Sequence, residues 1–209
     1  VSIVPVYIGY ENVMEVKSYL NELKGSKKKK ESNLQVFSAI RKLKNYGHGY
    51  VNFGEPIALN QFLENHVPNW RDCRDAEPEK KPAWLTPAVN ELANNVMTRI
   101  NRAAALNGMA LASLCLLSSK RQTMSEAELK QAMGDFMDLF KAVPFSDDAT
   151  IPDSSAEELL RDTLKLGRFD VKEDDYGRLI SPQPKSAVYL TYYRNNILHL
   201  FAIPGLIMA

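Results

Sequence analysis

The chain begins inside an apolar segment, VSIVPVYIGYE, and this beginning limits the folds that it can adopt. From Ser2 to Ile8 the residues are mostly β-branched or aromatic, and Gly9 follows them, which is typical of a buried β-strand. Such a strand needs partners, because two strands alone are rarely stable in water. Since no strand precedes Val1 in the sequence, we expect the chain to be a piece of a larger α/β domain.

The order of elements over residues 1–67 is typical of an α/β domain. Helix-forming residues run from about Met14 to Lys24, and a second helical pattern follows at residues 36–43. The stretch GYVNFGEPI, Gly49 to Ile57, then predicts a strand that a Gly-Glu-Pro turn closes. Strand, helix, helix, strand is the usual order in a parallel sheet. We therefore predict the last part of an α/β domain with a mixed or parallel sheet.

A charged, proline-containing stretch, PNWRDCRDAEPEKKP, follows and predicts a linker at residues 68–85. Thr86 and Pro87 are typical of a helix start, and the apolar positions after them predict a core-facing stripe. Further helices are predicted after two capping boxes, Ser125 to Glu128 and Ser155 to Glu158. The stretch FDVKEDDYGRLI predicts a hairpin, and a last helix begins at about Ser186. Residues 86–209 are thus predicted to be a mostly helical region with one β-hairpin.

Composition excludes several classes of protein. The formal net charge of +1 is not that of a globally basic nucleic-acid binder. The two cysteines, Cys73 and Cys115, lack CxxC spacing and are predicted to be reduced thiols. The longest interior apolar run, at residues 109–117, is too short for a membrane span, which needs about 20 residues.

The common catalytic motifs are absent from the sequence. There is no GxSxG, no GxxxxGKS or GxxxxGKT, and no HExxH. Three scattered histidines are too few for a metal site. A His and Asp pair of the HxxxxD kind is also absent, because the positions five residues after His48, His66 and His199 hold Phe, Arg and Pro.

Three stretches carry a resemblance to a known family: VSIVPVYIGYE at residues 1–11, GYVNFGEPI at 49–57 and YYRNNILHLF at 192–201. In this order and at these separations they resemble the bacterial glycerol-3-phosphate 1-O-acyltransferases of the glycerolipid acyltransferase family. The first stretch is similar to the fourth conserved block of that family, an apolar strand containing Val-Pro-Val. The similarity extends along the chain, including VPFSDDATIP at residues 143–152.

The resemblance implies that three conserved blocks, one of them the HxxxxD catalytic pair, lie upstream of Val1. No catalytic residue is then expected in this chain. Residues 1–67 become the last part of the acyltransferase domain. Val4, Pro5, Val6 and Tyr7 would contribute to binding of the acyl donor. A buried parallel strand has the same apolar pattern, so a purely structural role for these four residues stays open.

The reaction implied by the resemblance moves an acyl group from acyl-CoA or acyl-acyl carrier protein to the sn-1 hydroxyl of glycerol 3-phosphate, the first step of phospholipid synthesis. No cofactor or metal is expected, and membrane phospholipid is an expected partner, at the cytoplasmic face of the bacterial inner membrane. Two alternatives stay open. One is the related dihydroxyacetone-phosphate acyltransferase, and the other is a non-catalytic docking or regulatory module.

Charge is distributed unevenly along the chain. Between Lys17 and Lys44, nine basic residues stand against Glu22 and Glu31, a local balance of +7. The tract Lys27 to Lys30 is either a solvated loop or a surface that attracts anionic lipid or acidic acyl carrier protein. We predict no nucleic-acid binding, because no aromatic residues alternate with these lysines.

The last segment of the chain is predicted to pack on the core and to make further contacts. In the final helix, apolar residues share one face and predict core packing: Leu190, Tyr193, Ile197, Leu200 and Phe201. Arg194 either holds a phosphate or ties the helix to the α/β domain. Residues 197–209 are apolar except for His199, and they form a docking segment, a membrane contact or part of a longer helix.

Overall fold

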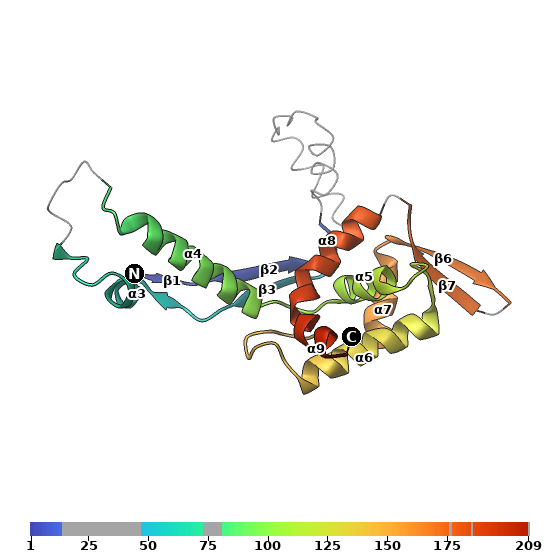
Figure 1. Cartoon of the computed structure of the whole chain (residues 1–209). Coiled ribbons are helices and arrows are strands. Elements are labelled where there is room, and N and C mark those ends of the chain that lie inside the picture. The colour runs from blue at the N-terminus through green and yellow to red at the C-terminus, as the bar shows by residue number, and fades with distance from the viewer. Residues whose placement is uncertain (14–46, 73–80, 176, 185, 209) are drawn as a thin grey trace, which may run out of the picture.

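The computed structural model describes residues 1–13, 47–72, 81–175, 177–184 and 186–208. Over these residues the chain is a mixed α/β structure, about half of it helical, with three small sheets. The elements nearest the N-terminus form an elongated arm that extends from a helical body (Figure 1). The helices predicted between residues 14 and 43, the tract Lys27 to Lys30 and Cys73 lie outside the described residues.

The arm is built from two antiparallel strand pairs and two helices. β1 (Ser2–Ile3) pairs with β4 (Ile57–Ala58), and β2 (Val6–Tyr10) pairs with β3 (Gly49–Phe53). The helices of the arm are α3 (Leu59–His66) and α4 (Leu85–Arg102).

The parallel pairing predicted for residues 1–67 is wrong for the strands that the structure describes. β2 and β3 run antiparallel, with Val6 opposite Phe53 and Tyr10 opposite Gly49. The order of strands and helices does not fix strand direction, because a connection that contains helices can also return to form an antiparallel pair. The expected mixed sheet of a complete acyltransferase domain is not seen among the described residues, where the largest sheet has three strands.

Pro5 divides the predicted first strand into β1 and β2. Proline has no N–H to donate to a ladder, so it is usual at a strand end or a distortion, and Pro5 lies between the two strands. Its carbonyl still accepts a hydrogen bond of 2.9 Å from the Gly54 N–H. The ladder between β2 and β3 is therefore continued on the carbonyl side of Pro5.

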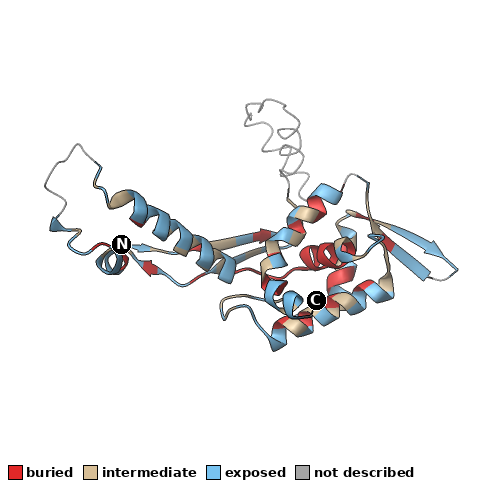
Figure 2. Ribbon diagram, in the orientation of Figure 1, coloured by how far each residue is buried: buried red, intermediate tan, exposed pale blue. Residues whose placement is uncertain are grey.

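The centre of the body is α5 (Gly108–Ser118), an almost entirely apolar helix. All its residues from Gly108 to Leu116 are buried, and Figure 2 shows it as the most continuously buried helix of the chain. Asn107 caps its start by accepting a hydrogen bond of 2.9 Å from the Ala110 N–H. A helix that is apolar on every side has to lie inside the protein, and its neighbours here are α6, α7 and α8.

The helices around α5 follow the sequence predictions closely. α6 (Glu126–Ala142) and α7 (Ala156–Lys165) both begin with the predicted capping boxes. α8 (Ala187–Leu198) begins directly after Ser186, close to its predicted start, and η3 (His199–Phe201) and α9 (Ala202–Met208) continue it. The predicted inner face of this segment, from Leu190 to Phe201, is buried.

The predicted hairpin is confirmed as β6 (Phe169–Asp174) and β7 (Gly177–Pro182). β5 (Met124–Ser125) adds a third strand, so the order in this sheet is β5-β7-β6. Gly167 ends α7 with a φ of +67°, a conformation that favours glycine.

The predicted apolar stripe of α4 is only partly buried. Leu92, Val96 and Ile100 are half-buried, whereas Val89 is 52% exposed. The stripe has the correct helical spacing, but the described part of the arm offers it few apolar partners.

The linker at residues 68–85, which would divide the chain into two domains, stays a prediction. Within the described residues, no helix combines the length and the apolar character that crossing a membrane requires.

Candidate functional site

The four residues predicted to bind the acyl donor lie at the start of β2. Val4 is 46% exposed, Pro5 is buried, and Val6 and Tyr7 are half-buried. Side chains alternate along a strand, so Val6 and Tyr7 point to opposite faces of the ribbon that β2 and β3 form. The structure therefore brings the four residues together along the chain without directing them into one pocket.

Tyr7 belongs to the inner face of the ribbon and packs against the helical core. Its hydroxyl is buried without a hydrogen bond of good geometry to the described residues. Burial raises the pKa of Tyr7, and the nearby Ala105 backbone opposes this effect. Gly9 leaves space for the ring, because a Cβ atom there would lie 2.8 Å from Tyr7 Cε1. These contacts describe Tyr7 as an anchor for the ribbon.

Asn52, directly opposite Tyr7, fixes the same face to the body. Its side-chain amide donates hydrogen bonds to the Ala103 carbonyl at 2.9 Å and to Thr150 Oγ1 at 2.8 Å. A backbone bridge between Ala105 and Thr150 lies beside them. The inner face of the ribbon is therefore held by both apolar and polar contacts.

A buried carboxylate, Glu11, joins the ends of β2 and β3. It accepts hydrogen bonds from the His48 N–H at 2.9 Å and from Tyr50 Oη at 3.0 Å, and His48 Nδ1 lies 3.2 Å away. Burial and the neighbouring carboxylate raise the pKa of Tyr50. Gly47, at φ +67°, allows the close approach, because a Cβ atom there would lie 2.5 Å from Glu11 Oε2.

A histidine beside a carboxylate can act as a general base, since the carboxylate orients the ring. In this protein the Glu11 carboxylate is shared with Tyr50 and the backbone, and His48 is mostly exposed. The arrangement is better suited to closing the end of the ribbon than to catalysis. Sequence reasoning missed it, because Glu11 and His48 are 37 positions apart and no short motif joins them.

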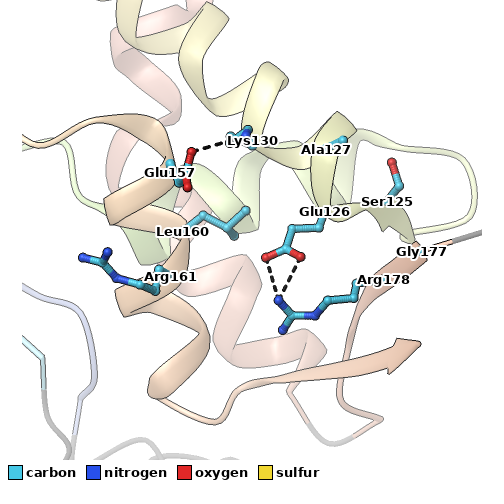
Figure 3. Close-up of a pocket in the computed structure, with 9 residues that line it drawn as sticks. All are labelled: Ser125, Glu126, Ala127, Lys130, Glu157, Leu160, Arg161, Gly177 and Arg178. Atoms are coloured by element: carbon cyan, nitrogen blue, oxygen red, sulfur yellow. Dashed lines mark hydrogen bonds and ion pairs between the residues drawn. The ribbon is translucent and has the colours of Figure 1, made fainter. Parts of the chain in front are cut away.

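A pocket of about 600 Å³ lies between the start of α6, α7 and β7. Figure 3 shows Glu126 reaching toward Arg178 and Lys130 toward Glu157. Arg178 Nη1 lies 2.9 Å from both Glu126 carboxylate oxygens, and Lys130 Nζ lies 3.4 Å from Glu157 Oε2. Because these cations already have carboxylate partners, the pocket offers an anionic substrate little unpaired charge.

An apolar groove of about 390 Å³ lies between the end of α6 and the C-terminal segment. Phe145 stacks edge-on against His199, with ring centroids 5.2 Å apart. Two residues of α9, Leu206 and Ile207, are 78% and 80% exposed. This surface agrees with the docking and membrane roles predicted for residues 197–209 and does not choose between them.

The remaining histidines make contacts typical of structural residues. His66 Nδ1 lies 2.8 Å from the Phe62 carbonyl, and His199 Nε2 lies 3.0 Å from the Asn101 carbonyl. Arg194 contacts the Asn195 side chain at 3.0 Å. Among the described residues, no group of three or more His, Cys, Asp or Glu side chains could hold a metal ion.

Comparison with known proteins gives consistent matches. A family model described as "Glycerol-3-phosphate acyltransferase C-terminal region" matches residues 19–209. The chain is 95% identical over 209 residues to a glycerol-3-phosphate acyltransferase of Alteromonas mediterranea. It is 61% identical to the protein of that name from Pseudoalteromonas atlantica and 52% identical to that of Aeromonas hydrophila. Each match covers 100% of this chain and 26% of the relative, so the chain spans about a quarter of the relatives' length.

Proposed function

The chain belongs to the glycerol-3-phosphate acyltransferase C-terminal region family, and we propose that it works as part of a longer enzyme that acylates glycerol 3-phosphate. The observation that carries this proposal is the match along the whole chain to proteins of that name. Those names also favour glycerol 3-phosphate over dihydroxyacetone phosphate as the acceptor.

The proposed reaction is acyl transfer from a thioester to the sn-1 hydroxyl. The hydroxyl oxygen attacks the thioester carbonyl, a general base takes its proton, and the thiol of coenzyme A or acyl carrier protein leaves. The base is proposed to be the histidine of an HxxxxD pair upstream of Val1, because no His in this chain has Asp five positions later. The reaction needs no resident cofactor, since the acyl donor is already activated.

Within this chain, the proposed contacts with the donor are at the start of β2. Val4 and Val6 present apolar surface away from the helical core, which suits an acyl chain. Pro5 and Tyr7 would hold this surface in place, since Pro5 is buried and Tyr7 packs against the core. The division of roles follows from the alternation of side chains along the strand.

The proposed location of the intact protein is the cytoplasmic face of the bacterial inner membrane. Support comes from exposed apolar residues at the end of the chain, Ile203, Leu206 and Ile207, beside the groove under α9. A surface of this kind suits contact with phospholipid. The acceptor and the product of the reaction would then be handled next to the bilayer.

The test uses the longer protein that contains this chain. Purified full-length enzyme is given glycerol 3-phosphate with acyl-CoA or with acyl-acyl carrier protein, and thiol release and the acylated position are measured. We expect release that depends on glycerol 3-phosphate and product acylated at sn-1. The isolated 209-residue chain serves as the matched negative control. Thiol release without any dependence on glycerol 3-phosphate would contradict the proposal.

A further inference from the structure

We propose that the outer face of the β2–β3 ribbon is the surface on which the remaining polypeptide of the intact protein packs. This outer face, which lies beyond the donor contact proposed at Val4 and Val6, consists of Ile8, Tyr10, Gly49, Val51 and Phe53. The proposal depends on family membership and on the length of the relatives. It does not depend on which donor or acceptor the enzyme uses.

The register of the ribbon separates two unlike faces. Tyr7 and Asn52 lie opposite each other on the inner face, and both are fastened to the body. Ile8 and Val51 lie opposite each other on the outer face and are 54% and 55% exposed, and Phe53 is 68% exposed. The outer face therefore carries adjacent apolar side chains that the described residues leave open to solvent.

A ribbon of this kind is incomplete as a folding unit. Two strands alone are marginally stable, and open strand edges with apolar side chains favour association. Within the described residues, β2 and β3 pair only with each other. The outer face also lacks charged residues, whereas exposed strands usually carry charges that prevent unwanted pairing. These features are typical of a surface that another layer covers.

The polypeptide that covers the outer face is inferred from what the family members contain beyond this chain. The relatives are about four times as long, since the chain covers 26% of them. The model of the C-terminal region begins at residue 19, so β2 lies before the first residue that this model matches. We infer that β2 is structurally part of the preceding region and that this region covers the outer face. A second copy of the chain and a membrane are the alternatives that the test must separate.

The experiment measures cysteine accessibility in the full-length protein. Ile8→Cys and Val51→Cys are compared with Val171→Cys and Val188→Cys, which occupy exposed positions of the body. The native Cys73 and Cys115 are replaced by Ser in every variant, and maleimide labelling is followed peptide by peptide. We expect labelling at positions 8 and 51 to be at least tenfold slower than at 171 and 188, with equal rates in urea. Equal rates in the native protein would overturn the proposal.

Dilution and transfer from vesicles to detergent separate the three candidates for covering the outer face: the remaining polypeptide, a second copy and a membrane. Protection that disappears when the protein is diluted to a monomer would assign the face to a second copy. Protection present only in vesicles and lost in detergent would assign it to the membrane. Either result would overturn the proposal, whereas protection that persists in a detergent-solubilised monomer supports it.

A second variant pair keeps the test independent of labelling chemistry. Val51→Lys places a charge on the outer face, and Val171→Lys places one on an exposed strand of the hairpin. In the full-length protein we expect the first to lower the melting temperature by several degrees and the second to leave it nearly unchanged. Equal melting temperatures for the two variants would show that the face around Val51 is open to water.

Discussion

The hydroxyl of Tyr193 accepts a hydrogen bond of 2.8 Å from the backbone N–H of Val13, which is 180 positions away in the sequence. Next to it, Arg168 Nη2 donates to Asn12 Oδ1 at 2.6 Å, and the Arg168 guanidinium lies over the Tyr189 ring. These contacts join the end of β2 to the first turns of α8. The arm and the helical body are thus connected by specific polar contacts as well as by packing of Tyr7.

The first prediction concerns this connection. Tyr193→Phe keeps the buried ring but removes the acceptor, so the partly buried Val13 N–H loses its partner. We expect the free energy of unfolding to fall by about 1 kcal/mol, the usual net value of such a bond. Urea unfolding measures it, with Tyr192→Phe, at a half-exposed position, as the control. Equal losses in the two variants would argue against a role for the hydrogen bond.

The same residue predicts a dependence on alkaline pH. Burial raises the pKa of Tyr193 above its ordinary value of 10.0 in the folded protein. A raised pKa means that the folded state holds the proton more tightly, so this stability is complete below pH 10 and is lost as pH rises above it. Tyr193→Phe should therefore show a shallower loss of stability above pH 10 than the unchanged protein. An identical slope would contradict this expectation.

The second site for a stability test is Glu11. Glu11→Gln keeps the shape but replaces one acceptor oxygen by an NH₂ group, which then faces either the Tyr50 donor at Oε1 or the His48 donor at Oε2. Because the site is buried, we expect a loss of about 1–3 kcal/mol in the free energy of unfolding. Glu64→Gln is the matched control, since Glu64 pairs with Arg71 on an exposed helix surface. There the loss should stay below about 0.5 kcal/mol.

Local signals in the sequence predicted local structure well. The Ser and Glu of each capping box form the expected reciprocal bonds at the starts of α6 and α7. The alternation around Asp174 and Gly177 gave the correct hairpin. These features depend on residues within a few positions of one another, which is why their pattern identifies them.

Features that depend on distant partners were not predictable in the same way. The antiparallel direction of β3 relative to β2, and the Glu11 to His48 contact, both depend on how the chain returns after residue 46. The stripe on α4 has the spacing of a core helix, yet it is only partly buried, because burial depends on a partner surface that the described residues provide only in part. Periodicity predicts which face of an element is apolar, and it does not identify what covers that face.

The fourth prediction concerns the tract Lys27 to Lys30, which the sequence places within a strongly basic segment. Replacing the four lysines by Gln in the full-length protein should weaken its binding to anionic vesicles or to acyl carrier protein. The loss should shrink as salt rises, because exposed charges are screened within about 8 Å at physiological ionic strength. Vesicle sedimentation across a salt series measures it, with neutral vesicles as the control. If binding to both partners is unchanged, the tract is only a solvated loop.

The last prediction tests the proposed donor contact. Val6 is half-buried at the start of β2, directly opposite the exposed Phe53, and its side chain points away from the core that Tyr7 contacts. Val6→Phe adds bulk to this surface, so in the full-length enzyme it should shift the preference toward shorter acyl chains. The KM for glycerol 3-phosphate should change little, because the added ring lies at the surface proposed for the acyl chain. Rates with a series of acyl-CoA lengths measure the shift, and Val171→Phe on the distant hairpin controls for added bulk. A change confined to the KM for glycerol 3-phosphate would mean that the start of β2 does not contact the donor and serves only to build the ribbon.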